Sequence, residues 1–274
     1  MTNKLLWTLA AGAVLAQSVY ATDFQTLATA DGVEYGYQQG IKGKPILVVI
    51  TTDIAESLSD KYSDASTVFR NAGYTLIAID VPCHGKDAKK KEPTGLTCWN
   101  KRANDSKTDI FLPYISKLQN VLAAVKEKGI ADASAIGVLG VSRGGYLAMR
   151  VASEIPEVTF VIAMAPVTDI FRLSEFKESK APKELYSLKA SYPTLAKKHI
   201  FIQINNDDDR VGTMEALSFI TGVTKSINTK DVDLMAILTP KKGHSTSEHQ
   251  MAAAWALDRQ RETTGVSIQK PAPK

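Results

Sequence analysis

The sequence SAIGVLGVSRGGYLAMRVASE, residues 134–154, carries more structural information than any other part of the chain. The short apolar run before Gly140 is typical of a buried strand, and residues 146–152 lack a helix breaker. The turn between them leaves the Ser142 hydroxyl projecting alone, near the free N–H groups of the helix that follows. This pattern predicts a nucleophilic serine. The alternative is a Gly-rich turn with an incidental serine, because the pentapeptide alone is weak evidence.

Length and composition indicate one large α/β domain. With 274 residues, of which 44% are hydrophobic and 23% charged, the chain can bury a full core. The net charge of +4 is modest, and the basic residues are interspersed with acidic ones. A nucleic-acid partner is therefore not expected.

The N-terminus predicts a secretory signal peptide over residues 1–21. Lys4 precedes an apolar stretch, and small residues occupy positions −3 and −1 before a cleavage point after Ala21. The stretch is shorter than the roughly 20 residues that span a bilayer, and Thr22 stands where a bacterial lipid anchor would need a cysteine. We therefore expect a periplasmic or secreted protein without a stable membrane anchor, with a single domain over residues 22–274.

The two cysteines, Cys83 and Cys98, fall in one predicted loop. In an oxidising compartment they are expected to form a disulfide, and two reduced, buried thiols are the alternative. Closing a loop of this size would stabilise the fold by about 3 kcal/mol.

Strands and helices alternate along the chain, which predicts a mostly parallel, doubly wound sheet with helices on both faces. An antiparallel pair is expected at one edge, formed by residues 24–27 and 33–37 around Asp31-Gly32. Further strands are expected at 46–50, 74–80, 136–139, 160–165, 200–204 and 231–238. Helices are expected at 58–71, 109–128, after Ser142 and at 245–262, with an irregular segment at 81–103.

A serine nucleophile needs a base, and the base needs a carboxylate that orients it. Catalytic groups of such a sheet come from the carboxyl ends of its strands. His244 follows the last predicted strand and is the expected base; His84 is a weaker rival, while His199 and His249 are poorly placed. The acid is expected among the adjacent aspartates of the sequence Asp207-Asp208-Asp209, and spacing alone does not choose between them.

Five segments together resemble the α/β-hydrolase superfamily over essentially the whole mature chain. They are Asp80-Val-Pro-Cys-His-Gly85, Gly140-Val-Ser-Arg-Gly-Gly145, Ala165-Pro-Val-Thr-Asp169, Asp208-Asp-Arg-Val211 and Gly243-His244. Their form is most similar to the prolyl-oligopeptidase-like and dienelactone-hydrolase-like branch. The resemblance implies the α/β-hydrolase fold, Asp208 as the acid, and no catalytic part for His84.

One segment departs from this resemblance. Where such proteins usually have His-Gly after the third strand, this chain has Thr51-Thr52-Asp53. One oxyanion donor, the N–H of Arg143, is unaffected, and the second is expected from the backbone of Thr52 or Asp53. An Asp53 carboxylate pointing inward would oppose the developing negative charge.

The leading hypothesis is an exported serine hydrolase that cleaves small or medium esters through Ser142, Asp208 and His244, without metal or organic cofactor. A small, partly polar cap is expected over about 167–198. A serine peptidase and a non-catalytic binding protein of the same fold are the alternatives. The expected partner is a small-molecule ester or a peptide substrate. The sequence leaves the oligomeric state open. The lysine-rich run at 86–91 could favour acidic substrates, although such runs are usually only solvated.

Overall fold

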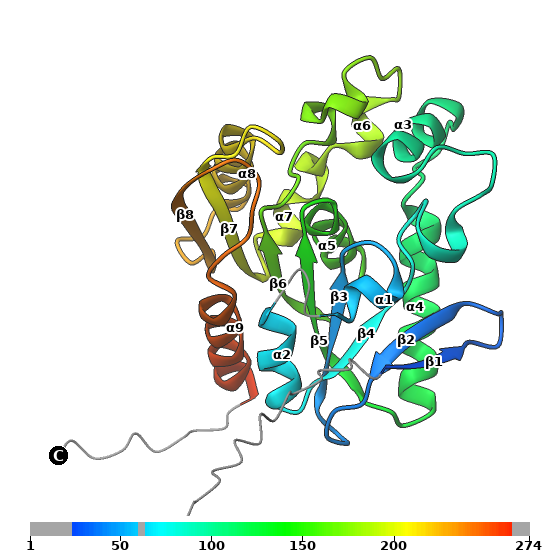
Figure 1. Ribbon diagram of the computed structural model, residues 1–274. Coiled ribbons are helices and arrows are strands. Elements are labelled where there is room, and N and C mark those ends of the chain that lie inside the picture. The colour runs from blue at the N-terminus through cyan, green and yellow to red at the C-terminus, as the bar shows by residue number, and fades with distance from the viewer. Residues whose placement is uncertain (1–23, 60–63, 265–274) are drawn as a thin grey trace, which may run out of the picture.

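The structure is a computed structural model that describes residues 24–59 and 64–264, so the predicted signal peptide lies outside the described residues. One sheet of eight strands has the order β1-β2-β4-β3-β5-β6-β7-β8 (Figure 1). The strands are β1 (Gln25–Ala28), β2 (Glu34–Gln38), β3 (Pro45–Ile50), β4 (Thr75–Ala78), β5 (Asp132–Val141), β6 (Val158–Met164), β7 (His199–Asp207) and β8 (Leu234–Lys242).

Strands β3 to β8 are parallel, and β1 and β2 are antiparallel at one edge, as predicted. Alternate residues of β3 belong to two separate hydrophobic clusters, with Ile46 on one face of the sheet and Leu47 on the other. Burial on both faces explains the continuous apolar run at this strand.

Helices cover both faces (Figure 1). They are α1 (Ile54–Ser57), α2 (Asp64–Asn71), α3 (Gly95–Asp105), α4 (Leu112–Glu127), α5 (Arg143–Glu154), α6 (Lys183–Tyr186), α7 (Tyr192–Leu195), α8 (Thr213–Lys225) and α9 (His249–Thr264). Buried residues of α1, α2 and α9 pack against one face, and those of α4, α5, α7 and α8 against the other. The predicted doubly wound α/β architecture is confirmed.

The segment between β4 and α4 differs from the prediction of an irregular loop. Residues 95–105 form α3, which buries Leu96, Trp99 and Ala103 at helical spacing. The lysine-rich run and Pro93 before the helix hid this pattern, because both are typical of loops.

Other elements also differ from the prediction. Of the expected helix over 58–71, residues 64–71 form α2, and residues 60–63 lie outside the described residues. A separate short helix, α1, comes before it, and the Asp53 side chain caps this helix. Helix α8 was not predicted; its sequence contains Gly222 and several threonines, which favour helix weakly. The last strand runs on to Lys242, and the last helix begins at His249 rather than at Ser245.

The predicted cap over about 167–198 contains short helices only. Besides α6 and α7 these are the 3-10 segments η2 (Ile170–Arg172), η3 (Ser174–Phe176) and η4 (Leu188–Ser191), and a further segment, η1 (Gly85–Asp87), follows β4. In the described part of the chain, no helix is both long and apolar enough to cross a membrane.

Candidate active site

Ser142 occupies a strained turn between β5 and α5. Its φ of 55° and ψ of −115° lie in a region that residues other than glycine rarely adopt. Two hydrogen bonds hold this conformation: the Ser142 N–H donates to the Met164 carbonyl at 2.9 Å, and the Val167 N–H donates to the Ser142 carbonyl at 3.0 Å. The turn lifts the hydroxyl above the carboxyl edge of the sheet.

The glycines around Ser142 are required by close backbone contacts. A Cβ atom on Gly140 would lie 2.1 Å from the Gly144 carbonyl oxygen, and one on Gly144 would lie 1.9 Å from the Ile50 carbonyl oxygen. On Gly145 it would lie 2.6 Å from Pro166. The sequence Gly-x-Ser-x-Gly-Gly therefore reflects how tightly α5 packs against the sheet at this turn.

His244 lies between Ser142 and Asp208. Its Nε2 is 3.0 Å from Ser142 Oγ, and its Nδ1 is 2.8 Å from Asp208 Oδ2. His244 comes two residues after β8, and Gly243 before it has a φ of 72°, which permits the sharp change of direction. The three residues expected to act together are thus within hydrogen-bonding distance in the order that proton transfer requires.

Asp208 differs from its two neighbours in burial and bonding. Its side chain is fully buried, and Oδ1 accepts hydrogen bonds from the N–H groups of Arg210 and Val211, both at 3.1 Å. Burial opposes ionisation, but the hydrogen bonds from His244 and from these N–H groups outweigh it and hold the pKa of Asp208 below its usual value. Asp207 and Asp209 are exposed.

The other three histidines are engaged elsewhere. His84 contacts the Arg143 side chain, His199 Nδ1 lies 2.7 Å from Asp233 Oδ2 at the amino end of β7, and His249 Nε2 lies 3.0 Å from Thr246 Oγ1. The structure therefore brings neither His84 nor the other two into the position that His244 occupies.

The segment Thr51-Thr52-Asp53 runs along the side of the site. Asp53 accepts a hydrogen bond from the Glu56 N–H at 2.9 Å as the cap of α1, and it is not among the described residues that line the cavity at Ser142. Thr52 does line this cavity. No hydrogen bond within residues 24–59 and 64–264 engages the Thr52 N–H. The Asp53 carboxylate is thus directed into a helix cap rather than toward Ser142.

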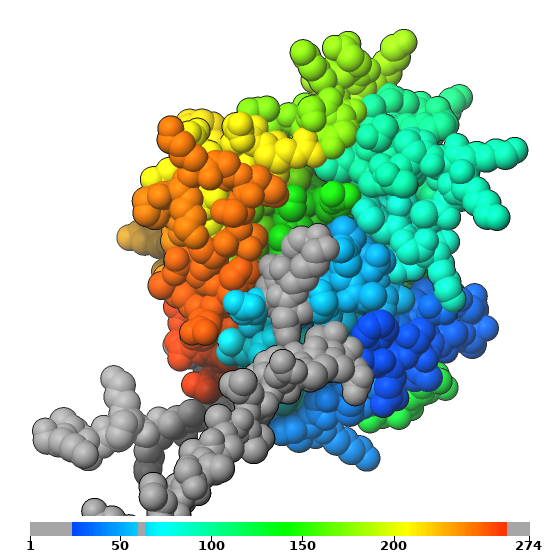
Figure 2. Space-filling view, viewed as in Figure 1, coloured from blue at the N-terminus to red at the C-terminus, as the bar shows by residue number. Residues whose placement is uncertain are grey.

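A cavity of about 460 Å³ opens at Ser142. Its lining comes from five segments: Thr51, Thr52, Leu96, Val141, Ser142, Arg143, Arg210, His244, Ser245 and Thr246. Figure 2 shows the green surface of the β5–α5 region recessed between the orange segment after β8 and the teal segment that includes α3. Of the described cap residues none lines this cavity.

An ion pair joins the cap to a residue that lines the site. The guanidinium of Arg210 donates to both carboxylate oxygens of Glu175, at 2.8 and 2.6 Å. Arg210 hydrogen bonding is the main cause that lowers the pKa of Glu175, to about 2. Because the Arg210 backbone also bonds Asp208, this pair anchors η3 next to the acid of the site.

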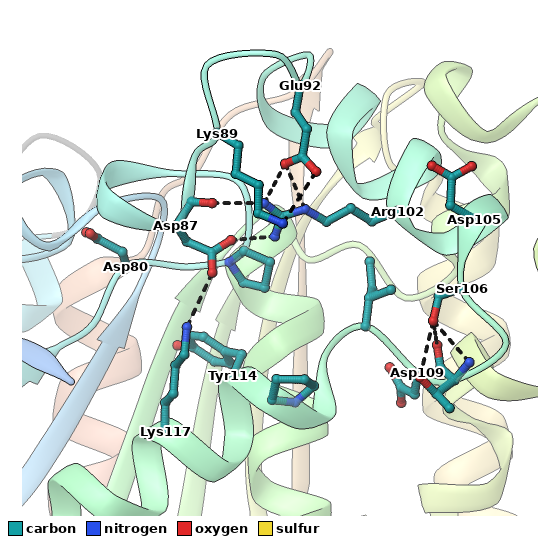
Figure 3. Close-up of a pocket in the computed structure, with 14 residues that line it drawn as sticks. Asp80, Asp87, Lys89, Glu92, Arg102, Asp105, Ser106, Asp109, Tyr114 and Lys117 are labelled. Atoms are coloured by element: carbon teal, nitrogen blue, oxygen red, sulfur yellow. Dashed lines mark hydrogen bonds and ion pairs between the residues drawn. The ribbon is translucent and has the colours of Figure 1, made fainter. Parts of the chain in front are cut away.

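The segment between β4 and α4, which borders the site, is held in place by a disulfide and by a group of ion pairs. Cys83 and Cys98 form the expected disulfide. Figure 3 shows Arg102 of α3 held between Asp87 and Glu92, with Lys117 of α4 reaching Asp87 at 3.3 Å. These contacts surround a second cavity, of about 420 Å³, and Lys89 lines that cavity rather than the one at Ser142.

Comparison with known sequences and structures identifies the family. The sequence matches the prolyl oligopeptidase family over residues 114–261, more than half of the chain. No curated protein matches.

Similar solved structures include peptidases and esterases. The acylaminoacyl peptidase of Pyrococcus horikoshii has a TM-score of 0.66 at 12% identity, with 91% of this chain and 43% of that chain covered. Dipeptidyl peptidase 4 of Porphyromonas gingivalis gives 0.60 at 16% identity, with 90% and 35% covered. Acetyl xylan esterase 1 of Thermoanaerobacterium gives 0.60 at 14% identity, with 89% and 83% covered.

The chain thus spans less than half the length of the two peptidases that it matches. At these identities the structural likeness establishes the fold, while the match over residues 114–261 establishes the family and supports a serine hydrolase. The chain belongs to the prolyl oligopeptidase family within the α/β-hydrolase superfamily.

Proposed function

We propose that the protein is a serine hydrolase that cleaves carboxylic esters of small or medium acyl groups. The observation that carries the proposal is the position of His244, with Nε2 at 3.0 Å from Ser142 Oγ and Nδ1 at 2.8 Å from Asp208. A serine hydroxyl becomes a useful nucleophile when a histidine oriented by a buried carboxylate removes its proton.

The reaction has two halves. Ser142 Oγ attacks the ester carbonyl while His244 takes its proton, and the backbone N–H groups of Arg143 and Thr52 stabilise the resulting oxyanion. His244 then returns the proton to the departing alcohol, which leaves an acyl group on Ser142. Water, deprotonated by His244, attacks this acyl group, and the acid is released with the serine restored.

Esters are favoured over amides by the lining of the cavity. Its volume of about 460 Å³ and its short apolar contribution from Leu96 and Val141 suit a small or medium acyl group. The second oxyanion donor comes from an unusual segment, Thr51-Thr52-Asp53. This donor belongs to a segment without the usual His-Gly, and reactive esters depend less on oxyanion stabilisation than amides do.

A serine peptidase is the second candidate, because the family match itself favours it. Rates of hydrolysis of p-nitrophenyl esters from acetate to octanoate, measured beside short peptide p-nitroanilides, separate the two. We expect the highest kcat/KM with the short and medium esters. Faster cleavage of the peptides would favour the peptidase, and no turnover of either class would favour a binding protein.

We also propose that the protein is exported to the periplasm or secreted. The support is the charge and apolar pattern of residues 1–21 together with the disulfide between Cys83 and Cys98, a bond that persists in oxidising compartments. N-terminal sequencing of the protein made from its full gene in a bacterial host should find Thr22 first in the extracytoplasmic fraction. Protein kept in the cytoplasm with residues 1–21 attached would contradict export.

A further inference from the structure

Strand β8 forms one edge of the sheet, and no strand of the described residues pairs with its outer side (Figure 1). It has nine residues, whereas β1, at the opposite edge, has four. An edge strand presents a row of backbone N–H and C=O groups to which another strand can bind, and proteins commonly keep such strands short. The long edge at β8 is therefore the better candidate for pairing with another chain.

The register of β8 against β7 shows which of its backbone groups point outward. The Ile200 N–H donates to the Asp233 carbonyl at 2.9 Å, so the backbone groups of Asp233 and of every second residue after it point toward β7. The N–H groups of Ala236 and Leu238 point toward the open edge instead. No hydrogen bond from the loops or side chains of the described residues engages these two donors. Both are thus available to an incoming strand.

Apolar side chains on both faces of β8 are exposed at this edge. Met235 is 41% exposed on the face where Ile237 packs with α2 and α9. Leu238 is 43% exposed on the opposite face, where Ala236 packs with residues of α8. Residues 234–239 carry no charge. A neighbouring strand would cover apolar side chains on both faces, because the side chains of paired strands lie beside each other.

Charges of opposite sign flank this uncharged run. Asp231 comes shortly before β8, while Lys241 and Lys242 form its carboxyl end, and all three are exposed. Asp233 is a second carboxylate at the amino end, and Lys230 offsets part of this negative charge. Within the described ranges, neither Asp231 nor Lys241 belongs to an ion pair. The two ends of the strand are therefore complementary to each other.

We propose that two copies of the chain associate through this edge, with antiparallel β8 strands related by a twofold axis at Ala236. Asp231 and Lys241 lie at equal separations along the chain from Ala236, so each Asp231 approaches Lys241 of the other copy. A parallel arrangement would bring like ends together. The N–H groups of Ala236 and Leu238 donate to carbonyls of the other copy, and Pro240, which has no N–H, ends the pairing.

The two active sites of this dimer are separate. His244 comes two residues after the carboxyl end of β8, and antiparallel strands place these ends at opposite sides of the joined sheet. Each chain keeps its own Ser142, Asp208 and His244, so this inference does not depend on the proposed function.

The first test is the oligomeric state of the protein purified from a host that expresses the full gene. Sedimentation velocity over a dilution series should show a dimer whose proportion rises with concentration. Hydrogen–deuterium exchange of peptides from β8 should be slower where the dimer predominates, while peptides from β1 should not change. A monomer at every concentration, or a dimer without protection of β8, would overturn the proposal.

The second test reverses the charges at the two ends. Asp231→Lys and Lys241→Asp each turn attraction into repulsion at both symmetry-related contacts, so each alone should weaken dimerisation by about tenfold or more. A mixture of the two variants should regain the dimer, because one chain then has lysines at both ends and the other has aspartates. Lys42→Asp, an exposed reversal in the turn before β3, is the matched control and should dimerise like the wild type.

Recovery in the mixture also shows that both variants are folded, because an unfolded β8 could not pair. Should a reversal prevent folding, Asp231→Asn and Lys241→Gln only remove the charges and should weaken the dimer by a smaller factor. Dimerisation that none of these variants weakens, or a mixture as weak as its components, would overturn the proposal. Ester hydrolysis by the same samples separates the two inferences: an active monomer removes only the dimer, and an inactive dimer removes only the hydrolase.

Discussion

His244 and Ser142 are 102 positions apart in the sequence, yet Nε2 of the histidine lies 3.0 Å from Oγ of the serine. They meet because β5 and β8 end at the same edge of a parallel sheet, with β6 and β7 between them. Asp208 follows β7, which ends at the same edge, and its carboxylate contacts the other ring nitrogen of His244.

Replacing Asp208 with Asn should lower kcat for ester hydrolysis on the order of 10⁴-fold, because an amide at this position favours the wrong imidazole tautomer. The matched control is Asp207→Asn, which removes an exposed carboxylate one residue away and should keep the wild-type rate. Steady-state kinetics of the two variants check this. Equal rates for both would mean that Asp208 does not orient His244.

The strained backbone at Ser142 predicts an unusual order of stability. Ser142→Gly should be more stable than Ser142→Ala by about 1 kcal/mol, because glycine adopts a φ of 55° without strain. At Ser116, an exposed position within α4, the order should reverse, because alanine favours helix. Urea unfolding of the four variants measures both differences, and the same order at both positions would argue against strain at the turn.

The disulfide between Cys83 and Cys98 should stabilise the fold by about 3 kcal/mol, because it closes a loop with a sequence separation of 15. The double variant Cys83→Ser with Cys98→Ser should therefore unfold at a lower urea concentration than the oxidised protein. Dithiothreitol should lower the midpoint of the wild type toward that of the double variant. A wild-type midpoint insensitive to dithiothreitol would indicate that the bond adds no stability.

The pair between Glu175 and Arg210 predicts a loss of stability in acid. The pKa of Glu175 is lowered from 4.5 to about 2, so its contribution is present above pH 4.5 and disappears as the pH falls through about 2. Glu175→Gln lacks this contribution at every pH. The difference in unfolding free energy between wild type and variant should fall by more than roughly half from pH 6 to pH 3. A difference that stays constant or grows over this range would contradict the assignment.

Much of the fold follows from local sequence patterns. Strands such as β3 are buried on both faces, and their continuous apolar runs are easy to recognise. Helix α3 was missed because its amphipathic residues follow a segment with the composition of a loop. Helix α8 was missed because threonines and Gly222 favour helix weakly, so its formation depends on packing against the sheet.

The candidate active site could also be predicted only in part from the sequence. Order along the chain and position at strand ends indicated Ser142 and His244. Spacing did not choose among the three adjacent aspartates; the family resemblance indicated Asp208, which is also the buried one of the three. The contact between Arg143 and His84 was not predictable, because it depends on the path of the loop after β4. The lysine-rich run attracted attention as a source of positive charge, but Lys89 lines the neighbouring cavity, and the arginines that line the cavity at Ser142 are Arg143 and Arg210.

The central claim is that Ser142 is a nucleophile activated by His244. It is tested most directly by labelling the folded protein with a fluorophosphonate probe and locating the modified residue by mass spectrometry. We expect one label, on Ser142, that is lost in Ser142→Ala and strongly reduced in His244→Gln. Labelling that persists in Ser142→Ala, or a folded wild-type protein that takes up no label, would contradict it.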